Sequence, residues 1–490
     1  MKENFYITTT LPYVNAAPHI GFALEIVQAD IIARYHRILG EEVIFNTGTD
    51  EHGLKIYRSA REEGKDIQKY VDENAAKFSK LKEVLNIDFT NFIRTTDPHH
   101  IAAAREFWRR CEKNGDVYKK NYQVKYCVGC ELEKTDSELA DGVCLIHPNL
   151  KLEFISEENY FFRFSKYQKP LLDLYEKYPD FVVPAHRLTE IKNFVANGLQ
   201  DFSVSRLKSK MPWGVSVPDD ETQVMYVWFD ALVNYVSTLG WPENEKNFEE
   251  FWGTKENPLA LQVAGKDNLR QQSAMWQAML LSAGLPTSRQ IIIHGFITGG
   301  NGQKMSKSLG NVESPFEIVE KYGTDALRFW LAHDVNPFED GDFTREKFRE
   351  SYNANLANGL GNFAARGLAL GSSLWQFEAP PVSSETAQKI DAVKEIVREK
   401  LNEFKFHEAL AAIWNLMAFG DGSINRTEPW KLTGEDKKGT VFDLIAILDN
   451  VAALLMPFIP ATASKITGSI IWSGSKLEIK KGEILFPRIS

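Results

Sequence analysis

Long apolar runs are missing from this sequence. No stretch reaches the ~18 consecutive apolar residues that a membrane-spanning helix needs, so no membrane partner is expected. The N-terminus, M-K-E-N-F-Y-I-T-T-T, is only briefly apolar before a proline-bearing loop, and it does not resemble a signal peptide. These absences make the cytoplasm the expected location.

An excess of positive charge is also missing. Lys and Arg number 57 against 66 Asp and Glu, which gives a formal net charge of −9. A strongly basic chain would have indicated a nucleic-acid-binding protein, but an acidic protein can still bind phosphate through a local basic patch. Internal repeats and low-complexity tracts are absent, and the 490 residues predict two to four globular domains.

Cysteine is scarce, and this argues against a scaffold of disulfides. Three of the four cysteines lie close together, as Cys127-Val-Gly-Cys130 and then Cys144-Leu-Ile-His147. Two ligand pairs, each with two residues between, are the spacing of a closed tetrahedral zinc site with three thiolates and one imidazole. Four protein ligands leave no open position, so we expect the zinc to be structural. Cys111 lies outside this pattern and is expected to be a buried helix residue.

Strand and helix patterns alternate from the N-terminus. Residues 4–10 are rich in aromatic and β-branched residues, which predicts a strand. Apolar residues at helical spacing predict a helix over 19–39, a buried strand follows over 41–50, and another helix begins near Leu54. This order predicts a parallel α/β sheet that binds ligands at the carboxyl ends of its strands.

The pattern changes over residues 118–218, which hold the cysteine cluster and helical stretches at 167–177 and 188–199. We interpret this segment as an insertion into the α/β domain. The α/β pattern then resumes at V-M-Y-V-W-F-D-A, at L-A-L-Q-V-A-G-K-D and at Q-I-I-I-H-G-F. The last of these is a continuous apolar run, typical of a buried parallel strand.

From about Arg345 onwards strands nearly disappear from the pattern. Prolines separate long amphipathic stretches, which predict a helical bundle. The four stretches cover 346–375, 384–403, 407–425 and 438–456. The last residues, E-I-L-F-P-R-I-S, are predicted to return as a short strand.

Two segments carry residue types that bind phosphate. His19 and Gly21 lie at the start of the predicted helix 19–39, where backbone N–H groups and the helix dipole favour an anion. G-G-N-G-Q-K-M-S-K-S-L-G-N places Lys304 and Lys307 on a glycine-rich loop, and two mobile positive charges suit a polyphosphate. Each segment alone also fits a capped helix or a solvated loop, but their pairing in one α/β domain predicts a nucleotide site.

These segments together resemble class I aminoacyl-tRNA synthetases, and among them the methionyl-tRNA synthetases of the bacterial form with a single zinc knuckle. The resemblance covers essentially the whole chain. It is carried by T-T-L-P-Y-V-N-A-A-P-H-I-G, F-N-T-G-T-D-E-H-G, the cysteine cluster, Y-V-W-F-D-A, H-G-F, K-M-S-K-S-L-G-N and E-P-W.

The resemblance implies an α/β fold: a Rossmann-like parallel-sheet catalytic domain with a zinc-knuckle insertion, followed by an all-α helical-bundle anticodon-binding domain. The expected segments are 1–117 and 219–298 for the two halves of the catalytic domain, 118–218 for the insertion with its knuckle at 126–148, 299–345 for the K-M-S-K-S loop and stem-contact region, and 346–490 for the anticodon-binding domain.

The resemblance also implies the roles of particular residues. His19, Lys304 and Lys307 are the expected catalytic residues. ATP is expected to contact these three together with Gly21, Glu25, Gly265, Asp267 and His294. Methionine is expected to contact Leu11, Tyr13, Asp50, Arg206, Trp228, Ala231, Tyr235 and Trp276. The anticodon-reading residues implied are Asn362, Arg366 and Trp430, and the zinc ligands are Cys127, Cys130, Cys144 and His147.

Three positions depart from the family pattern. Phe22 stands where a second histidine is usual, Asn268 where an isoleucine is usual, and Gln272 where a histidine is usual. Asn268 and Gln272 are four residues apart, so on one helix they would share a face and could hydrogen-bond each other. Otherwise the methionine pocket is more polar than in the family.

The implied function is a methionine–tRNA ligase that uses ATP, methionine and tRNA(Met), with Mg²⁺ accompanying ATP, in initiation and elongation of translation. A synthetase for another apolar amino acid, an adenylate-forming paralogue without tRNA charging, and an inactive tRNA-binding protein stay open as alternatives. The chain ends just after the predicted bundle, and we expect a monomer.

Overall fold

The computed structural model describes residues 3–130, 132–134, 139–302, 305, 312–374 and 376–489. The chain divides into two compact units. Unit 1 comprises Met1–Pro18, Gly40–Leu81 and Phe89–His294, and unit 2 comprises His19–Leu39, Lys82–Asp88 and Gly295–Ser490. None of the helices within the described ranges is both long enough and apolar enough to cross a bilayer.

A six-stranded sheet forms the centre of unit 1, in the order β3-β2-β1-β14-β15-β9, and every neighbouring pair is parallel. The predicted parallel α/β sheet is therefore confirmed. Buried residues dominate its central strands, because helices and loops cover both faces of such a sheet. The strands are β1 (Asn4–Thr9), β2 (Glu42–Thr49), β3 (Asn91–Arg94), β9 (Val182–Val183), β14 (Leu261–Gly265) and β15 (Gln290–His294).

Helices of unit 1 pack against this sheet: α10 contacts β1, α3 contacts β2 and α7 contacts β9. Asp66 begins α3 by accepting a hydrogen bond from the backbone N–H of Lys69, at 3.0 Å, as an N-cap does. These helices are α2 (Leu54–Glu62), α3 (Ile67–Ser79), α5 (Pro98–Lys113), α6 (Gln168–Lys177), α7 (Ala185–Ala196), α8 (Val227–Leu232), α9 (Asn234–Ser237), α10 (Glu245–Trp252) and α11 (Trp276–Ser282).

The predicted insertion is present as antiparallel sheets. Long strands β4 (Val117–Cys127) and β8 (Glu153–Phe162) pair along most of their length, and the sheet order is β10-β8-β4-β5. A second small sheet has the order β11-β13-β12. The remaining strands are β5 (Leu132–Lys134), β6 (Leu139–Ala140), β7 (Val143–Cys144), β10 (Phe202–Ser203), β11 (Ser205–Leu207), β12 (Ser216–Val217) and β13 (Asp220–Met225).

One predicted return to the α/β pattern, at V-M-Y-V-W-F-D-A, is wrong. Val224 and Met225 end the antiparallel strand β13, and Val227 already begins helix α8. A short buried apolar run looks alike in a strand and in a helix, so its pattern cannot separate the two.

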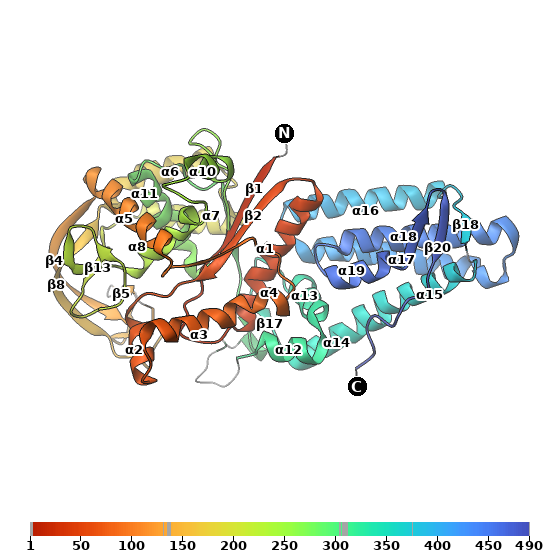
Figure 1. The fold of residues 1–490 in the computed structure, drawn as a ribbon, viewed down its shortest axis with the longest axis horizontal. Helices are drawn as coiled ribbons and strands as arrows, with labels where there is room; N and C mark the ends of the chain where they lie inside the picture. The colour runs from red at the N-terminus through yellow and green to blue at the C-terminus, as the bar shows by residue number, and fades with distance from the viewer. Residues whose placement is uncertain are drawn as a thin grey trace. The chain divides into compact units, whose positions relative to one another are not determined.

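Helices dominate unit 2, and the long helices α16, α17 and α18 run alongside one another (Figure 1). Most of the predicted stretch 346–375 lies in one continuous helical segment, which begins at Arg345 and ends at Ser372 and in which a π-helix at Tyr352–Gly361 joins two α-helices. The helices are α1 (Ile20–Ile38), α12 (Pro315–Tyr322), α13 (Thr324–His333), α14 (Arg345–Ser351), α15 (Asn362–Ser372), α16 (Ser384–Asn402), α17 (Phe406–Thr427), α18 (Gly434–Leu455) and α19 (Pro460–Thr467).

The bundle ends in a small antiparallel sheet that the sequence pattern did not predict in this position. Its strands are β18 (Gln376–Glu378), β19 (Ile470–Ser473) and β20 (Lys476–Ile479), in the order β18-β20-β19. Among the described residues after β20, 480–489, none forms a strand, so the predicted strand at E-I-L-F-P-R-I-S is wrong. Phe486 is buried there instead, and it packs edge-on against Tyr352 at 5.9 Å.

A buried arginine holds the parts of unit 2 together. Arg328 on α13 is fully buried, and it forms an ion pair of 2.7 Å with Asp30 on α1. Its other N–H groups donate to the backbone carbonyls of Leu85, Pro457 and Phe458, at 2.8–3.0 Å. One guanidinium therefore joins four segments that are distant in the sequence.

Candidate functional site

Candidate ligand residues gather at one edge of the sheet in unit 1. Asp50 directly follows β2, and Asp267 follows β14 by two residues. His294 is the last residue of β15, and Tyr13 comes four residues after β1. The strand order reverses between β1 and its neighbour β14, and α/β sheets bind ligands outside the carboxyl ends of their strands at such a point.

Backbone pairing joins the segments after β1 and β2. The Asp50 N–H donates to the carbonyl of Pro12 at 3.0 Å, and the N–H of Val14 donates to the carbonyl of Asp50 at 3.2 Å. Tyr13 and Asp50 are bridge partners in this pairing. Two of the predicted methionine contacts, one aromatic and one anionic, are thus brought together, and the Asp50 residue is 8% exposed.

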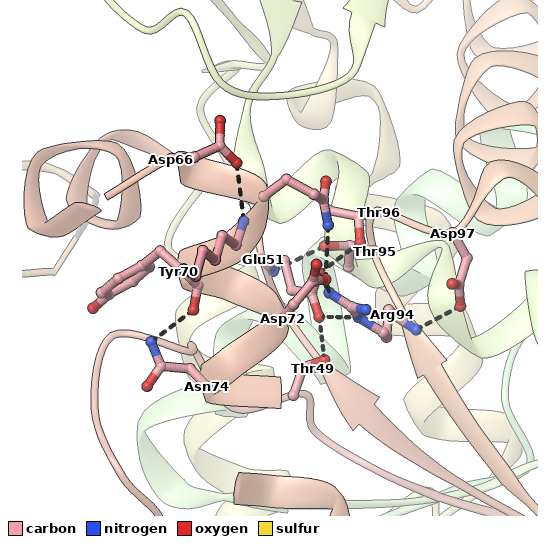
Figure 2. Close-up of polar contacts among 12 residues, drawn as sticks. Thr49, Glu51, Asp66, Tyr70, Asp72, Asn74, Arg94, Thr95, Thr96 and Asp97 are labelled. Atoms are coloured by element: carbon pink, nitrogen blue, oxygen red, sulfur yellow. Dashed lines mark hydrogen bonds and ion pairs between the residues drawn. The ribbon is translucent and has the colours of Figure 1, made fainter. Parts of the chain in front are cut away.

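Glu51, the next residue, is the centre of a polar network (Figure 2). Its side chain is fully buried and accepts hydrogen bonds from Thr49 Oγ1 at 2.7 Å and Thr96 Oγ1 at 2.6 Å. Arg94 donates Nε and Nη2 to its two carboxylate oxygens at 2.6 and 2.9 Å. Arg94 also reaches Asp72 on α3 at 2.5 Å. Burial alone would lower the pKa of Arg94, but the carboxylates of Glu51 and Asp72 outweigh it and raise that pKa.

His52 continues the chain of buried polar contacts. His52 Nδ1 lies 2.6 Å from one oxygen of Asp230 on α8, and His100 Nε2 lies 2.9 Å from the other. Asp230 and His100 are fully buried, and His100 Nδ1 lies 3.0 Å from Ser237 Oγ on α9. Burial would raise the pKa of Asp230, but the two histidines outweigh it and lower the pKa to about 2. Asp230 is therefore an anion between two imidazoles.

The predicted aromatic contacts come from neighbouring helices. Trp228 and Ala231 lie on α8, Tyr235 on α9 and Trp276 at the start of α11. The ring of Tyr235 meets that of Trp276 edge-on, with centroids 5.8 Å apart. Trp276 also stacks on Phe107 at 5.5 Å and is fully buried, whereas Trp228 is partly exposed. Tyr235 and Trp276 thus belong to one core cluster, and Trp228 packs against it.

The predicted hydrogen bond between Asn268 and Gln272 is wrong. Gln272 Nε2 donates instead to the hydroxyl of Tyr235 at 2.6 Å, and Asn268 Nδ2 donates to Asp267 at 3.3 Å. Residues 266–268 form a 3₁₀ turn and 271–275 a π-helix. The rotation per residue in these helices differs from that of an α-helix, so residues four apart do not share a face.

Arg206 on β11 is buried and held by its own neighbours. Its Nη1 donates to Ser203 Oγ and to the carbonyl of Ser205, each at 2.7 Å. Its guanidinium lies over the ring of Tyr226 at 4.7 Å and over that of Tyr126 at 5.4 Å. These contacts fix its orientation, and its role toward a carboxylate stays a prediction.

The predicted nucleotide contacts divide between the two units. Gly265, Asp267 and His294 belong to unit 1, where Gly265 and His294 are buried and Asp267 is exposed. His19, Gly21 and Glu25 belong to unit 2, with His19 at the N-cap of α1. Lys304 and Lys307 lie outside the described residues.

His19 has a defined orientation. Its Nδ1 accepts a hydrogen bond from the backbone N–H of Gly21 at 3.1 Å, so the ring proton of the neutral histidine is on Nε2. A side chain at position 21 would put its Cβ 2.9 Å from His19 Cε1, so the imidazole would have to move from this orientation. Phe22 is partly exposed in the first turn of the same helix.

The four predicted metal ligands come together, and all four ligand atoms lie within 4.8 Å of one another. Cys130 Sγ lies 3.5 Å from Cys144 Sγ and 3.2 Å from His147 Nδ1. A tetrahedron with Zn–S bonds of about 2.3 Å has edges of about 3.8 Å, so the donor set fits Zn²⁺. Gly129 leaves room for the imidazole, because a Cβ there would lie 2.6 Å from His147 Cγ. Cys111 is buried in α5, as predicted.

The predicted anticodon-reading residues lie on unit 2. Asn362 and Arg366 lie on α15, where Asn362 is exposed. Arg366 donates to Asp421 at 2.8 Å and to Asn425 at 3.3 Å, both on α17. Trp430 follows α17 and is 57% exposed, unlike most large apolar side chains. An exposed indole and an oriented guanidinium are groups on which unpaired bases stack and hydrogen-bond.

Several residues of the network at the sheet edge were missed in the sequence: Glu51, His52, Arg94, His100 and Asp230. The available signal was D-E-H-G directly after a buried strand. Charged residues are rarely buried unless they are paired, so charged residues in this position indicate buried partners or a functional site. Their partners could not have been found, because Arg94 and Asp230 lie 43 and 178 residues away from Glu51 and His52.

Comparisons with known proteins agree with this geometry. A family model described as tRNA synthetases class I (M) matches residues 5–145 and 129–368, and one described as the anticodon-binding domain of tRNA ligase matches residues 385–485. The parallel sheet, the cysteine-cluster insertion and the helical domain are those of a class I aminoacyl-tRNA synthetase.

Individual relatives show which kind of class I synthetase the chain is similar to. A methionine–tRNA ligase of Thermosynechococcus vestitus is 41% identical over 489 residues, which cover 96% of this chain and 91% of that protein. A chloroplastic/mitochondrial methionine–tRNA ligase of Arabidopsis thaliana is 38% identical, covering 99% and 82%. A Mycobacterium tuberculosis methionyl-tRNA synthetase structure with bound methionyl-adenylate matches with a TM-score of 0.92 and 34% identity, covering 99% and 100%. The chain belongs to the methionyl-tRNA synthetases.

Proposed function

We propose that this chain is a methionine–tRNA ligase, which forms methionyl-adenylate from ATP and methionine and transfers the methionyl group to the 3′-terminal adenosine of tRNA(Met). The observation that carries the proposal is the full-length likeness to an enzyme solved with methionyl-adenylate. The carboxyl edge of the sheet in unit 1 supports it, because an anion, aromatic rings and the ends of β14 and β15 meet there.

Methionine binds in unit 1, with Asp50 accepting hydrogen bonds from the α-ammonium. Tyr13, Tyr235 and the tryptophans surround the thioether, which gains dispersion and sulfur–aromatic contacts. Two buried polar atoms support a ligand in this region: Gln272 Oε1 and Trp276 Nε1 have no hydrogen-bond partner among the described residues. Leu11, Arg206 and Ala231 complete the proposed set of contacts.

ATP binds as its Mg²⁺ complex, and its proposed contacts are Gly265, Asp267, His294, His19, Gly21 and Glu25. The methionine carboxylate attacks the α-phosphate in line, and pyrophosphate leaves with the electron pair of the broken P–O bond. Lys304 and Lys307 stabilise the charge that develops on the leaving group, and His19 donates its Nε2 proton to a phosphate oxygen. No side chain acts as a nucleophile, because catalysis is orientation and charge stabilisation.

The two remaining regions serve the tRNA. The Cys127–His147 knuckle holds one structural Zn²⁺ and keeps the insertion folded against the acceptor end. Asn362, Arg366 and Trp430 read the anticodon. We further propose that the five segments predicted from the sequence describe the domains, that the protein acts as a monomer, and that it works in the cytoplasm.

ATP–pyrophosphate exchange across a panel of amino acids, followed by charging of total tRNA, tests the proposed function. We expect exchange with methionine and transfer to tRNA(Met). Exchange with another apolar amino acid alone would make the chain a different synthetase. Exchange without charging would make it an adenylate-forming paralogue. The absence of both activities would make it an inactive tRNA-binding protein.

Replacing Cys144 by serine is expected to reduce bound zinc from about one per chain to nearly none, because a structural site needs all four ligands. Inductively coupled plasma mass spectrometry on purified protein measures the stoichiometry. Cys111→Ser, a cysteine outside the cluster, should keep its zinc. Full zinc occupancy in Cys144→Ser would show that the cluster is not the zinc site.

Replacing Trp430 by alanine is expected to lower kcat/KM for tRNA about 5- to 150-fold, since stacking on one base contributes about 1–3 kcal/mol. Methionine-dependent exchange should be unchanged, because the indole does not touch the adenylate. Trp472→Ala, also half-exposed on unit 2, is the matched control and should charge normally. Equal loss of charging and exchange would make Trp430 a structural residue.

A further inference from the structure

The buried turn after Asp50, residues 51–53, is held in place by hydrogen bonds of its backbone. The backbone N–H of Glu51 donates to Thr95 Oγ1 at 2.9 Å, and its carbonyl accepts from Trp213 Nε1 at 2.6 Å. The N–H of Gly53 donates to the carbonyl of Trp213 at 3.2 Å. These three hydrogen bonds of the backbone are the first anchor, and they leave residues 51–53 little freedom to shift.

The Glu51 carboxylate adds a second anchor (Figure 2). Its two oxygens receive four hydrogen bonds, two of them from the fork of Arg94, and the side chain is fully buried. Burying an ion pair contributes little to stability relative to an apolar core, because desolvation offsets the attraction. Such a pair instead holds its two side chains in one defined geometry. Here it holds Glu51, the residue next to Asp50.

His52 adds a third contact, which links the turn to helices α8 and α9. Through Asp230 it is joined to α8, which carries Trp228 and Ala231, and through His100 and Ser237 to α9, which carries Tyr235. One buried series of polar contacts therefore connects the segment that carries Asp50 with the helices that carry the predicted aromatic contacts to methionine.

We propose that Glu51 and His52 are positioning residues, which fix the backbone after Asp50 so that its carboxylate meets the α-ammonium of methionine. Neither side chain contacts the substrate. Each acts through Asp50, Glu51 from the side of β3 and His52 from the side of α8. The inference rests on the proposed function, in which Asp50 is the ammonium ligand.

Glu51→Gln tests the role of the carboxylate. The amide turns one acceptor into a donor that faces the donors of Arg94 and Thr96, so the turn must move. Because misplacement by ~1 Å costs up to about 100-fold, we expect KM for methionine in ATP–pyrophosphate exchange to rise roughly 10- to 100-fold. KM for ATP and kcat should stay within about twofold, since an ammonium contact made equally in ground and transition states changes KM alone.

Two further variants make the test independent of whether Glu51→Gln folds. Thr96→Val removes one of the four hydrogen bonds with little change in shape, and a rise of several-fold in KM for methionine is expected. Asp72→Asn is the matched control. It removes the negative charge of Asp72, the half-exposed outer partner of Arg94, and leaves the bonds between Arg94 and Glu51 in place, so KM should not change.

His52 is tested by a pair of substitutions. Asn places an amide donor where His52 Nδ1 stands, so His52→Asn should keep the contact with Asp230 and a KM for methionine near that of the wild type. His52→Ala leaves Asp230 without this donor and should raise that KM at least tenfold. A merely structural role would not produce rescue by asparagine together with an unchanged KM for ATP.

The outcomes separate the inference from the proposed function. Wild-type protein without methionine-dependent exchange would overturn both. Wild-type exchange combined with an unchanged KM for methionine in Thr96→Val and His52→Ala would overturn the inference alone. So would an equal rise in KM for ATP, or an effect of Asp72→Asn as large as that of Thr96→Val.

Discussion

Replacing Asp50 by asparagine is expected to lower kcat/KM for methionine by about 100- to 4000-fold. The substitution keeps the size of the side chain but removes the negative charge beside the α-ammonium. Truncating one partner of a desolvated charge pair costs roughly 3–5 kcal/mol, and about 1.4 kcal/mol corresponds to each tenfold change. ATP–pyrophosphate exchange at varied methionine concentration measures the loss.

The ATP dependence of the same variant is the internal control. KM for ATP should stay within about twofold, because the nucleotide contacts proposed in unit 1 follow β14 and β15 and not β2. The melting temperature should also be close to that of the wild type, since the backbone contacts of Asp50 with Pro12 and Val14 do not involve its side chain. A fall of less than about threefold would remove Asp50 as the ammonium ligand.

Replacing Arg328 by methionine is expected to destabilise unit 2 by about 3–5 kcal/mol, the largest effect on stability that the structure predicts. Methionine fills a similar volume but donates no hydrogen bonds, so three buried carbonyls lose their partner and the buried Asp30 loses one of its two arginines. Urea unfolding followed by far-ultraviolet circular dichroism measures the change in the free energy of unfolding.

Arg345→Met is the matched control in the same unit. Arg345 forms ion pairs with Glu313 at 2.9 Å and Glu317 at 3.1 Å, but its side chain is 48% exposed. Exposed pairs contribute at most about 1 kcal/mol, so this variant should be nearly as stable as the wild type. Equal losses in the two variants would contradict the role assigned to the buried guanidinium.

Features that depend on residues close to one another in the sequence were predicted correctly. Q-I-I-I-H-G-F was recognised as a buried strand because Ile291, Ile292 and Ile293 follow one another without interruption. The Cys127–His147 cluster was recognised because a metal site imposes its spacing on the sequence itself. The helix after His19 was predicted to within one residue at each end, because its apolar period and its preceding proline are local signals.

The errors came from segments whose neighbours in space decide the structure. V-M-Y-V-W-F-D-A divides between a strand and a helix because its partners are β11 and the core of unit 1, and not residues beside it in sequence. Gln272 turns to Tyr235 because a π-helix changes the direction of its side chain, and no residue of the local sequence announces that helix.

By itself the sequence determined the family, the parallel α/β sheet with its insertion, and the group of three cysteines and one histidine; the residues of the nucleotide and methionine sites stay predictions. These depend on periodicity, spacing and residue chemistry, which are all carried along the chain. Only the tertiary structure decided which side chains orient the site: Arg94 on Glu51, Asp230 between His52 and His100, and Gln272 on Tyr235. The physical reason is that a hydrogen bond forms between groups within about 3 Å in space, whatever their separation in sequence.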